Sequence, residues 1–203
     1  MAFQLAWETP TSWVERISEH TLELLEDHAH CELRAAASAQ AIISKRPRSR
    51  ELVKSLGIVA SEELEHFNQV VEILHARGGQ LGAAQNNPYA AGLLSGTSSR
   101  QGEVLLDRLL VSSLIEARSL ERFVLLSRHL PDAELRDLYQ SLVGSEAGHR
   151  ALFVHLAREH YPAKRVDERL AEFIEHEANV VSNLPFSPRM HSGVVESTAT
   201  VRV

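Results

Sequence analysis

Cysteine is almost absent from this 203-residue chain, in which Cys31 is the only one. A disulfide framework within the chain is therefore excluded, and so are zinc sites built from several thiolates. Aromatic residues are also scarce, at 5% of the sequence, whereas Leu, Ala and Glu are plentiful. This balance favours helices over sheets.

Long hydrophobic runs and an excess of positive charge are missing as well. No apolar run reaches the roughly 18 residues of a membrane span. The first 13 residues lack the basic and apolar regions of a signal peptide. The chain has 21 Lys and Arg against 27 Asp and Glu, a net charge of -6, so bulk charge predicts no non-specific binding to nucleic acid. We therefore expect a cytoplasmic protein with no membrane partner, in which a specific RNA partner would require clustered basic residues.

The sequence instead has a strong helical period. Apolar residues recur every three or four positions in four long segments. These segments cover about residues 12–45, 48–77, 101–129 and 132–160. Short connections within the first and second pairs of segments predict two antiparallel helical hairpins.

Three further segments complete the predicted fold. Residues 78 to about 100 are rich in Gly, Ser and Asn, which predicts a long loop that joins the two hairpins. A shorter helix is expected over about 166–182, and a flexible tail over about 187–203. The chain is thus predicted to be a single all-α domain, residues 1–203, built as a four-helix bundle with a crossover loop and a short C-terminal helix.

Six polar residues interrupt the apolar stripes of the four long helices. They are Glu32, Glu63, His66, Glu116, Glu146 and His149. Each half of the chain carries a lone Glu followed by a Glu-x-x-His motif, and the two glutamates are 31 positions apart in the first half and 30 positions apart in the second. Residues three apart lie on one side of a helix. Two hairpins related by a pseudo-two-fold axis would bring all six side chains together.

This pattern is typical of the dinuclear metal site of ferritin-like bundles. Buried carboxylates without partners are costly, and metal ions would offset that cost. Four carboxylates also balance the charge of two divalent cations, and a set of carboxylates and imidazoles suits iron or manganese. The six residues are therefore predicted to bind two metal ions.

A Glu-x-x-His or similar pair is a weak signal on its own. Asp27 with His30 and Glu72 with His75 have the same spacing, but they lie off the apolar stripes and are expected to be solvated. Cys31 is predicted to be a small packed residue rather than a ligand. Three other histidines could donate hydrogen bonds to ligand carboxylates, although a surface or core position is expected for each: His28, His155 and His160.

Beyond these ligands, five short stretches have a pattern typical of one family, and Ile-Glu-Ala-Arg-Ser is the most specific part of it. They cover residues 27–33, 63–67, 88–90, 114–119 with 121–123, and 145–149. In these stretches the sequence resembles the bacterial tRNA hydroxylases that act on 2-methylthio-N6-isopentenyladenosine beside the anticodon. The sequence departs from the family pattern at Gly148, where Arg is usual, and at Leu120, where Cys is common.

The resemblance implies a non-haem di-iron monooxygenase that hydroxylates the isopentenyl group. Its co-substrate would be O2, and two electrons would come from an external electron-transfer reductase. The first three ligands would then hold one iron ion and the last three the other, with some carboxylates bridging.

A tRNA substrate also requires a basic surface. Five basic residues cluster near the turn between the first two helices: Lys45, Arg46, Arg48, Arg50 and Lys54. They are candidate RNA contacts, although ordinary solvated charge is the commoner role of such residues. Arg118 and Arg122 are an alternative pair near Glu116.

Two other functions remain open from the sequence. A ferritin- or rubrerythrin-like protein for iron handling or peroxide scavenging would share the ligand set, although a single Cys excludes a rubredoxin-like site within this chain. A bundle that has lost its metal and only binds partners would be expected to lack at least one ligand, and all six are present.

Overall fold

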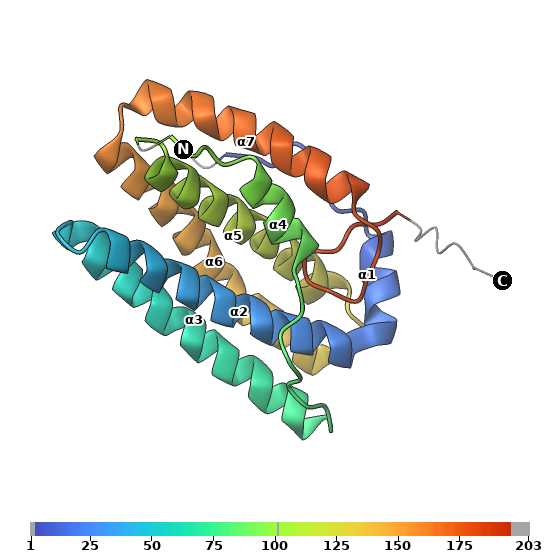
Figure 1. The fold of residues 1–203 in the computed structure, drawn as a ribbon. Coiled ribbons are helices and arrows are strands. Elements are labelled where there is room, and N and C mark those ends of the chain that lie inside the picture. The colour runs from blue at the N-terminus through green and yellow to red at the C-terminus, as the bar shows by residue number, and fades with distance from the viewer. Residues whose placement is uncertain (1–2, 101, 196–203) are drawn as a thin grey trace.

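The computed structural model describes residues 3–100 and 102–195, and all regular secondary structure within them is helical apart from one isolated bridge between Pro185 and Val195. Figure 1 shows the arrangement of the helices. They are α1 (Ser12–Ile17), the 3-10 helix η1 (Ser18–His20), α2 (Thr21–Lys45), α3 (Arg50–Ala76), α4 (Pro88–Ser95), α5 (Val104–His129), α6 (Ala133–His160) and α7 (Ala163–Asn183). The prediction of an all-α, ferritin-like bundle is confirmed.

Four long helices form the bundle, in which α2 packs against α3 and α5 packs against α6. The two hairpins meet through contacts of α3 with α6 and of α2 with α5. The connection from α3 to α5 passes along the bundle and carries α4, which lies beside α7 (Figure 1). Helix α7 thereby covers α4 and the second hairpin.

Several helix boundaries differ from those expected. The first long helix is divided at η1, where His20 has φ -132° and ψ 43°. Helix α7 begins three residues earlier than expected, directly after Pro162. Helix α4 lies in a segment that was expected to be a loop, and its N-cap is Asn87, whose side chain accepts a hydrogen bond from the backbone of Ala90.

Residues 184–195, the C-terminal strap, differ most from expectation. A flexible tail was expected from about residue 187, but Met190, His191 and Ser192 are buried. Their backbone is held by the second hairpin, since the Arg122 guanidinium donates to the carbonyl oxygens of Met190 and Ser192. The Trp13 indole donates to the Ser192 hydroxyl at 3.1 Å. The remainder of the expected tail, residues 196–203, lies outside the described residues.

The apolar core is divided into two clusters by a polar layer. On α2, for example, Leu25 and Ala29 belong to one cluster and Ala39 and Ile42 to the other, with Glu32 between them. The same order of apolar, polar and apolar positions occurs on α3, α5 and α6. The polar layer is therefore sealed at both ends by packed side chains.

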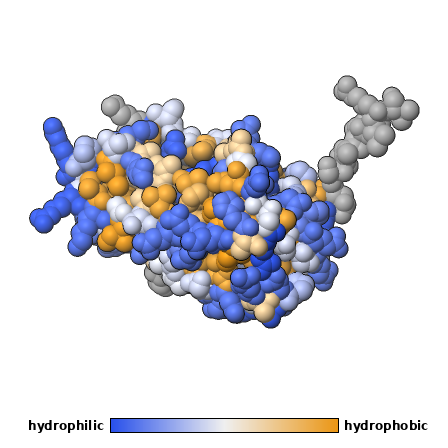
Figure 2. Space-filling model, turned by 90° about the horizontal axis from the view of Figure 1, so that it is seen from below, coloured by the Kyte–Doolittle hydropathy of each residue, from blue (hydrophilic) through white to orange (hydrophobic). Residues whose placement is uncertain are grey.

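One face of the molecule exposes both hydrophobic and hydrophilic residues. Figure 2 shows orange hydrophobic residues interspersed with blue hydrophilic ones on the face seen from below. None of the helices in the described part of the chain combines the length and apolarity that crossing a membrane requires.

Candidate metal centre

All six predicted ligand residues lie in the polar layer, and each is buried with at most 8% of its surface exposed. They come from the middle of the four long helices. Helix α2 supplies Glu32, α3 supplies Glu63 and His66, α5 supplies Glu116, and α6 supplies Glu146 and His149. The side chains converge because each occupies a core position of its helix, three or four residues from an apolar one.

The six side chains form two overlapping groups, each with ligand atoms within 4.8 Å of one another. One group consists of Glu32, Glu63, His66 and Glu146, and the other of Glu63, Glu116, Glu146 and His149. Glu63 and Glu146 belong to both groups. The geometry therefore suits two neighbouring metal positions with these two carboxylates between them.

Both imidazoles face the cluster through Nδ1. His66 Nδ1 lies 3.6 Å from Glu63, 3.7 Å from Glu146 and 4.0 Å from Glu32, in each case measured to a carboxylate oxygen. His149 Nδ1 lies 2.9 Å from Glu63 Oε1. The centroids of the two imidazole rings are 6.2 Å apart.

The cluster is electrostatically unfavourable without cations. Burial and neighbouring carboxylates raise the pKa of Glu32, Glu116 and Glu146 well above the ordinary value. Burial also acts on Glu63, but the closeness of His149 and His66 outweighs it and lowers the pKa of Glu63. Burial opposes protonation of His149, yet the contact with Glu63 raises the pKa of His149 to about 9.

Several buried atoms of the cluster make no hydrogen bond of normal geometry among the described residues, although Nδ1 of His149 and Oε1 of Glu63 form a close ion pair. These are both carboxylate oxygens of Glu63, Oε1 of Glu146, and Nδ1 of His66 and of His149. All of them point into the shared space, and each is a good ligand atom for a divalent transition metal. Unpartnered buried polar atoms are costly, and metal ions would satisfy them. The residues present therefore fit a dinuclear centre.

Two side chains outside the cluster hold its members in place. Glu62, which is half exposed, lies 2.7 Å from Nε2 of His149 and so fixes the imidazole with Nδ1 towards the cluster. His28 is fully buried, and its Nε2 lies 2.5 Å from Glu32 Oε1. Burial lowers the pKa of His28 to about 3, so that the ring is neutral. The sequence allowed a hydrogen bond from His28 to a ligand carboxylate but favoured a surface or core position, because Glu32, four residues along the helix, could not be distinguished from other carboxylates as its partner.

Comparison with known proteins gives a consistent assignment. Residues 2–192 match the family described as tRNA-(MS[2]IO[6]A)-hydroxylase (MiaE). The chain belongs to this tRNA hydroxylase family. Two curated relatives have the name tRNA 2-(methylsulfanyl)-N(6)-isopentenyladenosine(37) hydroxylase. The one from Pseudomonas putida is 34% identical over 96% of this chain and 95% of its own, and the one from Salmonella typhimurium is 28% identical over 92% of this chain and 86% of its own.

A solved structure is also similar over its full length. It is described as protein 43 with aldehyde deformylating oxygenase activity, from Synechococcus, and it is 39% identical to this chain. The TM-score is 0.90, with 97% of this chain and 99% of that chain covered. The tRNA hydroxylase family and this oxygenase therefore share one fold and substantial sequence.

The prediction that Arg118 and Arg122 are alternative RNA contacts is wrong. Arg118 and Arg122 are fully buried. Arg118 forms a two-pronged ion pair with Glu177 of α7, at 2.9 Å for both contacts, and Arg122 is bonded to the C-terminal strap. These arginines hold α7 and the strap against α5, and they were misjudged because their partners lie more than 50 residues away along the chain.

The other predicted RNA contacts remain accessible. All five of them are exposed: Lys45, Arg46, Arg48, Arg50 and Lys54. Lys45, Arg46 and Arg48 line one shallow pocket at the turn between α2 and α3. Their role in binding RNA stays a prediction.

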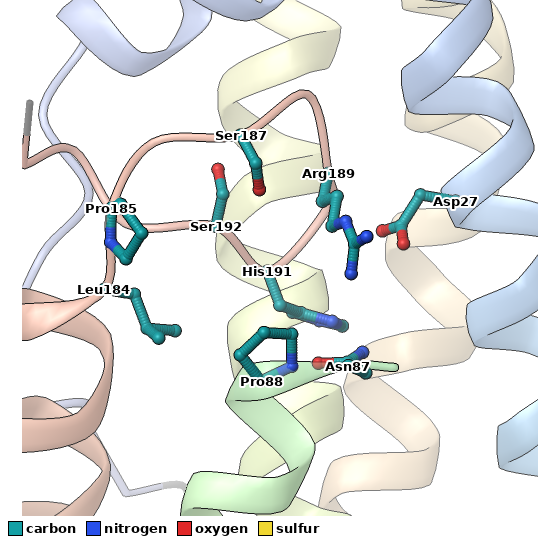
Figure 3. Close-up of a pocket in the computed structure, with 9 residues that line it drawn as sticks. All are labelled: Asp27, Asn87, Pro88, Leu184, Pro185, Ser187, Arg189, His191 and Ser192. Atoms are coloured by element: carbon teal, nitrogen blue, oxygen red, sulfur yellow. The ribbon is translucent and has the colours of Figure 1, made fainter. Parts of the chain in front are cut away.

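Two Asp/Glu–His pairs with the same spacing as the ligands were expected to be solvated. One of these pairs does lie on the surface, since Glu72 and His75 are exposed. The other pair is not solvated. His30 is buried and lies 3.1 Å from the Gly82 carbonyl oxygen, and Asp27 accepts a hydrogen bond from the Met190 backbone. Figure 3 shows Arg189 of the strap turned towards Asp27, with His191 beside Asn87 and Pro88. Asp27 is therefore part of the contact between α2 and the strap.

Proposed function

We propose that this protein hydroxylates the isopentenyl group of 2-methylthio-N6-isopentenyladenosine in the anticodon loop of tRNA. The observation that carries the proposal is a buried cluster of four carboxylates and two imidazoles in a chain of the tRNA hydroxylase family. The overall reaction inserts one atom of O2 into a C–H bond, while two electrons and two protons convert the other atom to water. The electrons would come from an external reductase.

The cofactor would be two iron ions. In this proposal Glu32 and His66 would hold one ion and Glu116 and His149 the other, with Glu63 and Glu146 within reach of both, since only these two belong to both groups. Iron supplies the activation of O2 that a C–H bond of this strength requires. The apolar clusters on both sides keep bulk water from the centre, and Glu62 keeps Nδ1 of His149 directed at it.

The modified base would have to leave its stack to reach a buried centre. Bases in single-stranded loops can be splayed out in this way. Two adjoining cavities between α2, α4 and α5 lead from the surface to Glu116, and the outer one has basic residues at its rim. We infer that Lys45, Arg46 and Arg48 contact phosphates of the tRNA, with Arg50 and Lys54 further along α3. A tRNA substrate also favours the cytoplasm as the location.

The similarity to the Synechococcus protein supports a second candidate, which is oxygen-dependent deformylation of an aldehyde. The same cluster could support that reaction, because the ligand set defines the oxygen chemistry and not the substrate. The lining of the cavities favours the nucleotide. A hydrocarbon aldehyde offers no partner for the cationic groups at the outer cavity, which are Arg34, Lys45, Arg46 and Arg108.

One experiment with two alternative substrates distinguishes the two candidate functions. The protein is loaded with iron, reduced, and exposed to O2 with either isopentenylated tRNA or an aliphatic aldehyde, and the Glu116→Ala variant serves as the control without turnover. We expect two irons per chain and one oxygen atom gained by the modified nucleoside. Formate release from the aldehyde with no change in the tRNA would replace the proposal with the second candidate. Iron uptake with neither product would point to iron handling.

A further inference from the structure

Two cavities lie next to each other between α2, α4 and α5. The inner cavity, of about 70 Å³, is lined by Glu116 of the candidate metal centre together with Cys31, Tyr89 and His191. The outer cavity, of about 630 Å³, opens towards the turn between α2 and α3. The two share five lining residues and therefore adjoin: Arg34, Ser38, Ala90, Ser112 and Ile115.

Among the residues that the structure describes, Arg34 is the only charged one that lines both cavities. Its Nη2 atom donates to the Gln85 carbonyl oxygen at 2.5 Å, which anchors the guanidinium to the connection before α4. Its Nη1 atom is buried and has no hydrogen-bond partner among the described residues. A buried donor without a partner is costly. The guanidinium also lines a third cavity, next to Glu23, Glu26 and Asp27. Because Arg34 lines both cavities at their junction, an acceptor bound there would satisfy Nη1 once the guanidinium turns towards it.

The surroundings of this donor define what kind of molecule would supply the acceptor. The apolar side chains of Ile115 and Ala90 line both cavities, of which the inner one reaches Glu116. Three cationic residues line the outer cavity: Lys45, Arg46 and Arg108. No acidic side chain is among the described residues that line the outer cavity, although the chain as a whole has a net charge of -6. The matching molecule has an apolar group at its inner end, hydrogen-bond acceptors next to that group, and negative charge outside.

A purine nucleotide with a hydrocarbon substituent on its exocyclic nitrogen has this order of groups. The ring nitrogens N1 and N7 flank the substituent and are acceptors. When the substituent points towards Glu116, these acceptors come to the junction, and the phosphates come to the cationic rim. Guanidinium groups also stack on base planes, which would add to the fit.

We propose that Arg34 recognises the base of the substrate at the junction of the two cavities and directs its hydrocarbon substituent towards Glu116. The inference rests on the proposed function and makes Arg34 a binding residue for the base, whereas Lys45, Arg46 and Arg108 bind the backbone. It predicts that Arg34 contributes to binding of the free modified nucleoside, which carries no phosphate. The rim residues contribute only when phosphates are present.

The test is a binding measurement without turnover. Iron-loaded protein is titrated under anaerobic conditions with free 2-methylthio-N6-isopentenyladenosine and with an anticodon stem-loop RNA that contains it. Arg34→Gln should weaken binding of both ligands at least tenfold, and Arg34→Lys should restore little, because an ammonium lacks the planar fork of donors. Arg46→Ala should weaken binding of the stem-loop alone. Arg128→Gln, an exposed arginine at the far end of α5, should change neither.

Iron content and helicity of each variant are measured alongside, so that loss of binding can be separated from loss of the centre or of the fold. Unchanged nucleoside binding in Arg34→Gln would overturn the inference, and so would an effect restricted to the stem-loop, since Arg34 would then be a phosphate contact. Failure of the wild-type protein to bind the nucleoside overturns it as well. The proposed function is decided separately, by whether the wild-type protein oxygenates the tRNA.

Discussion

Glu116 and Glu63 are both buried carboxylates of the metal centre, but their environments favour different protonation states. Burial and the nearby Glu146 raise the pKa of Glu116, so without metal its side chain holds a proton. Glu63 lies 2.9 Å from His149 and 3.6 Å from His66, which lowers its pKa and keeps it charged. The same substitution at the two positions should therefore have different effects on the metal-free protein.

Glu116→Gln replaces a protonated carboxyl with a neutral group of the same shape. We expect the melting temperature of the metal-free protein to stay within about 2 °C of wild type, because no buried charge is lost. Glu63→Gln removes the charged partner of two imidazoles and should destabilise the metal-free protein by about 1–3 kcal/mol. Both variants should bind at most one iron per chain. Their activity should fall at least about 100-fold, since replacing even a residue that only hydrogen-bonds to a metal ligand typically lowers metal affinity or activity 10–100-fold.

Thermal unfolding of chelator-treated protein, with iron counted per chain after reloading, tests these expectations. Glu65→Gln is the matched control, because Glu65 lies two residues from Glu63 on the exposed side of α3. Two irons in Glu116→Gln, or equal stability of the two metal-free variants, would contradict the assignment of ligands and charges.

His191 is a second residue whose charge matters for stability. Its ring stacks on Tyr89 with 4.8 Å between centroids, and its Nε2 lies 3.0 Å from the Ser119 hydroxyl. Burial, together with Arg122 and Arg118, lowers the pKa of His191 well below the ordinary value of about 6.5. The unfolded chain therefore binds a proton at His191 more readily than the folded chain does. The contribution to stability is complete above about pH 6.5 and is lost as the pH falls towards the folded pKa.

His191→Gln should accordingly reduce the loss of folding stability between about pH 7 and pH 5, even if its stability at pH 7 is lower than that of wild type. Chemical denaturation at the two pH values measures the difference. His155→Gln serves as the control for the same substitution at an exposed histidine, because the His155 side chain is 56% exposed. An unaltered pH dependence in His191→Gln would show that the ring is not buried in its neutral form.

The six cluster residues could be predicted from the sequence because helical periodicity fixes which positions face a core. A polar residue in phase with Leu25, Ala29 and Ala39 must be buried whatever its partners are, and both halves of the chain repeat the pattern. The roles of Arg118 and Arg122 could not be predicted, since they depend on Glu177 and on strap carbonyls that only the fold brings near.

At the scale of elements, the long helices were predictable and the segments that cover them were not. Helix α4 has only eight residues and little periodicity, although Asn87 followed by Pro88 is a helix-start signal within the supposed loop. The strap has no regular structure, and tertiary contacts alone hold it. Its burial could not be predicted from residues 184–195 themselves, because the groups that bind it, Trp13, Asp27 and Arg122, lie far away along the chain.

The strap depends on a glycine. A Cβ atom at Gly193 would lie 1.7 Å from the Leu184 carbonyl oxygen, so no side chain fits without a shift of the backbone. Gly193→Ala should therefore loosen the strap and destabilise the protein by about 1–3 kcal/mol, which lowers the melting temperature by several degrees. Gly148 is the opposite case, because it is exposed within α6 and has open space around it.

Gly148→Ala is expected to stabilise the protein by about 0.5–1 kcal/mol, because glycine in a helix interior loses more backbone entropy than alanine does. Thermal unfolding of the two variants tests both expectations, because the same Gly→Ala substitution should lower the melting temperature at position 193 and raise it at position 148. Equal tolerance of alanine at both positions would mean that the strap is not packed as the contact with Leu184 requires.

At the scale of the whole molecule, charge is distributed unevenly. The net charge is -6, yet Lys45, Arg46 and Arg108 gather at the outer cavity, where no acidic side chain is among the described lining residues. Such a local basic patch can bind a polyanion in an otherwise acidic protein, because charge interactions fade over about 8 Å at physiological salt. Binding of tRNA should then depend on position, so that a cation at this end contributes and a distant one does not.

Helix α5 offers a matched pair for this test, because Arg108 and Arg128 are both exposed and 20 residues apart, which is about 30 Å along a helix. We expect Arg108→Ala to weaken binding of the modified stem-loop and to reduce the slope of log K against log salt by about 0.7–0.9, the value for one phosphate contact. Arg128→Ala should leave both the affinity and the slope at their wild-type values. A filter-binding or fluorescence titration across several salt concentrations measures them. Equal effects of the two substitutions would mean that the RNA responds to total charge and not to the end of the bundle where the cavities open.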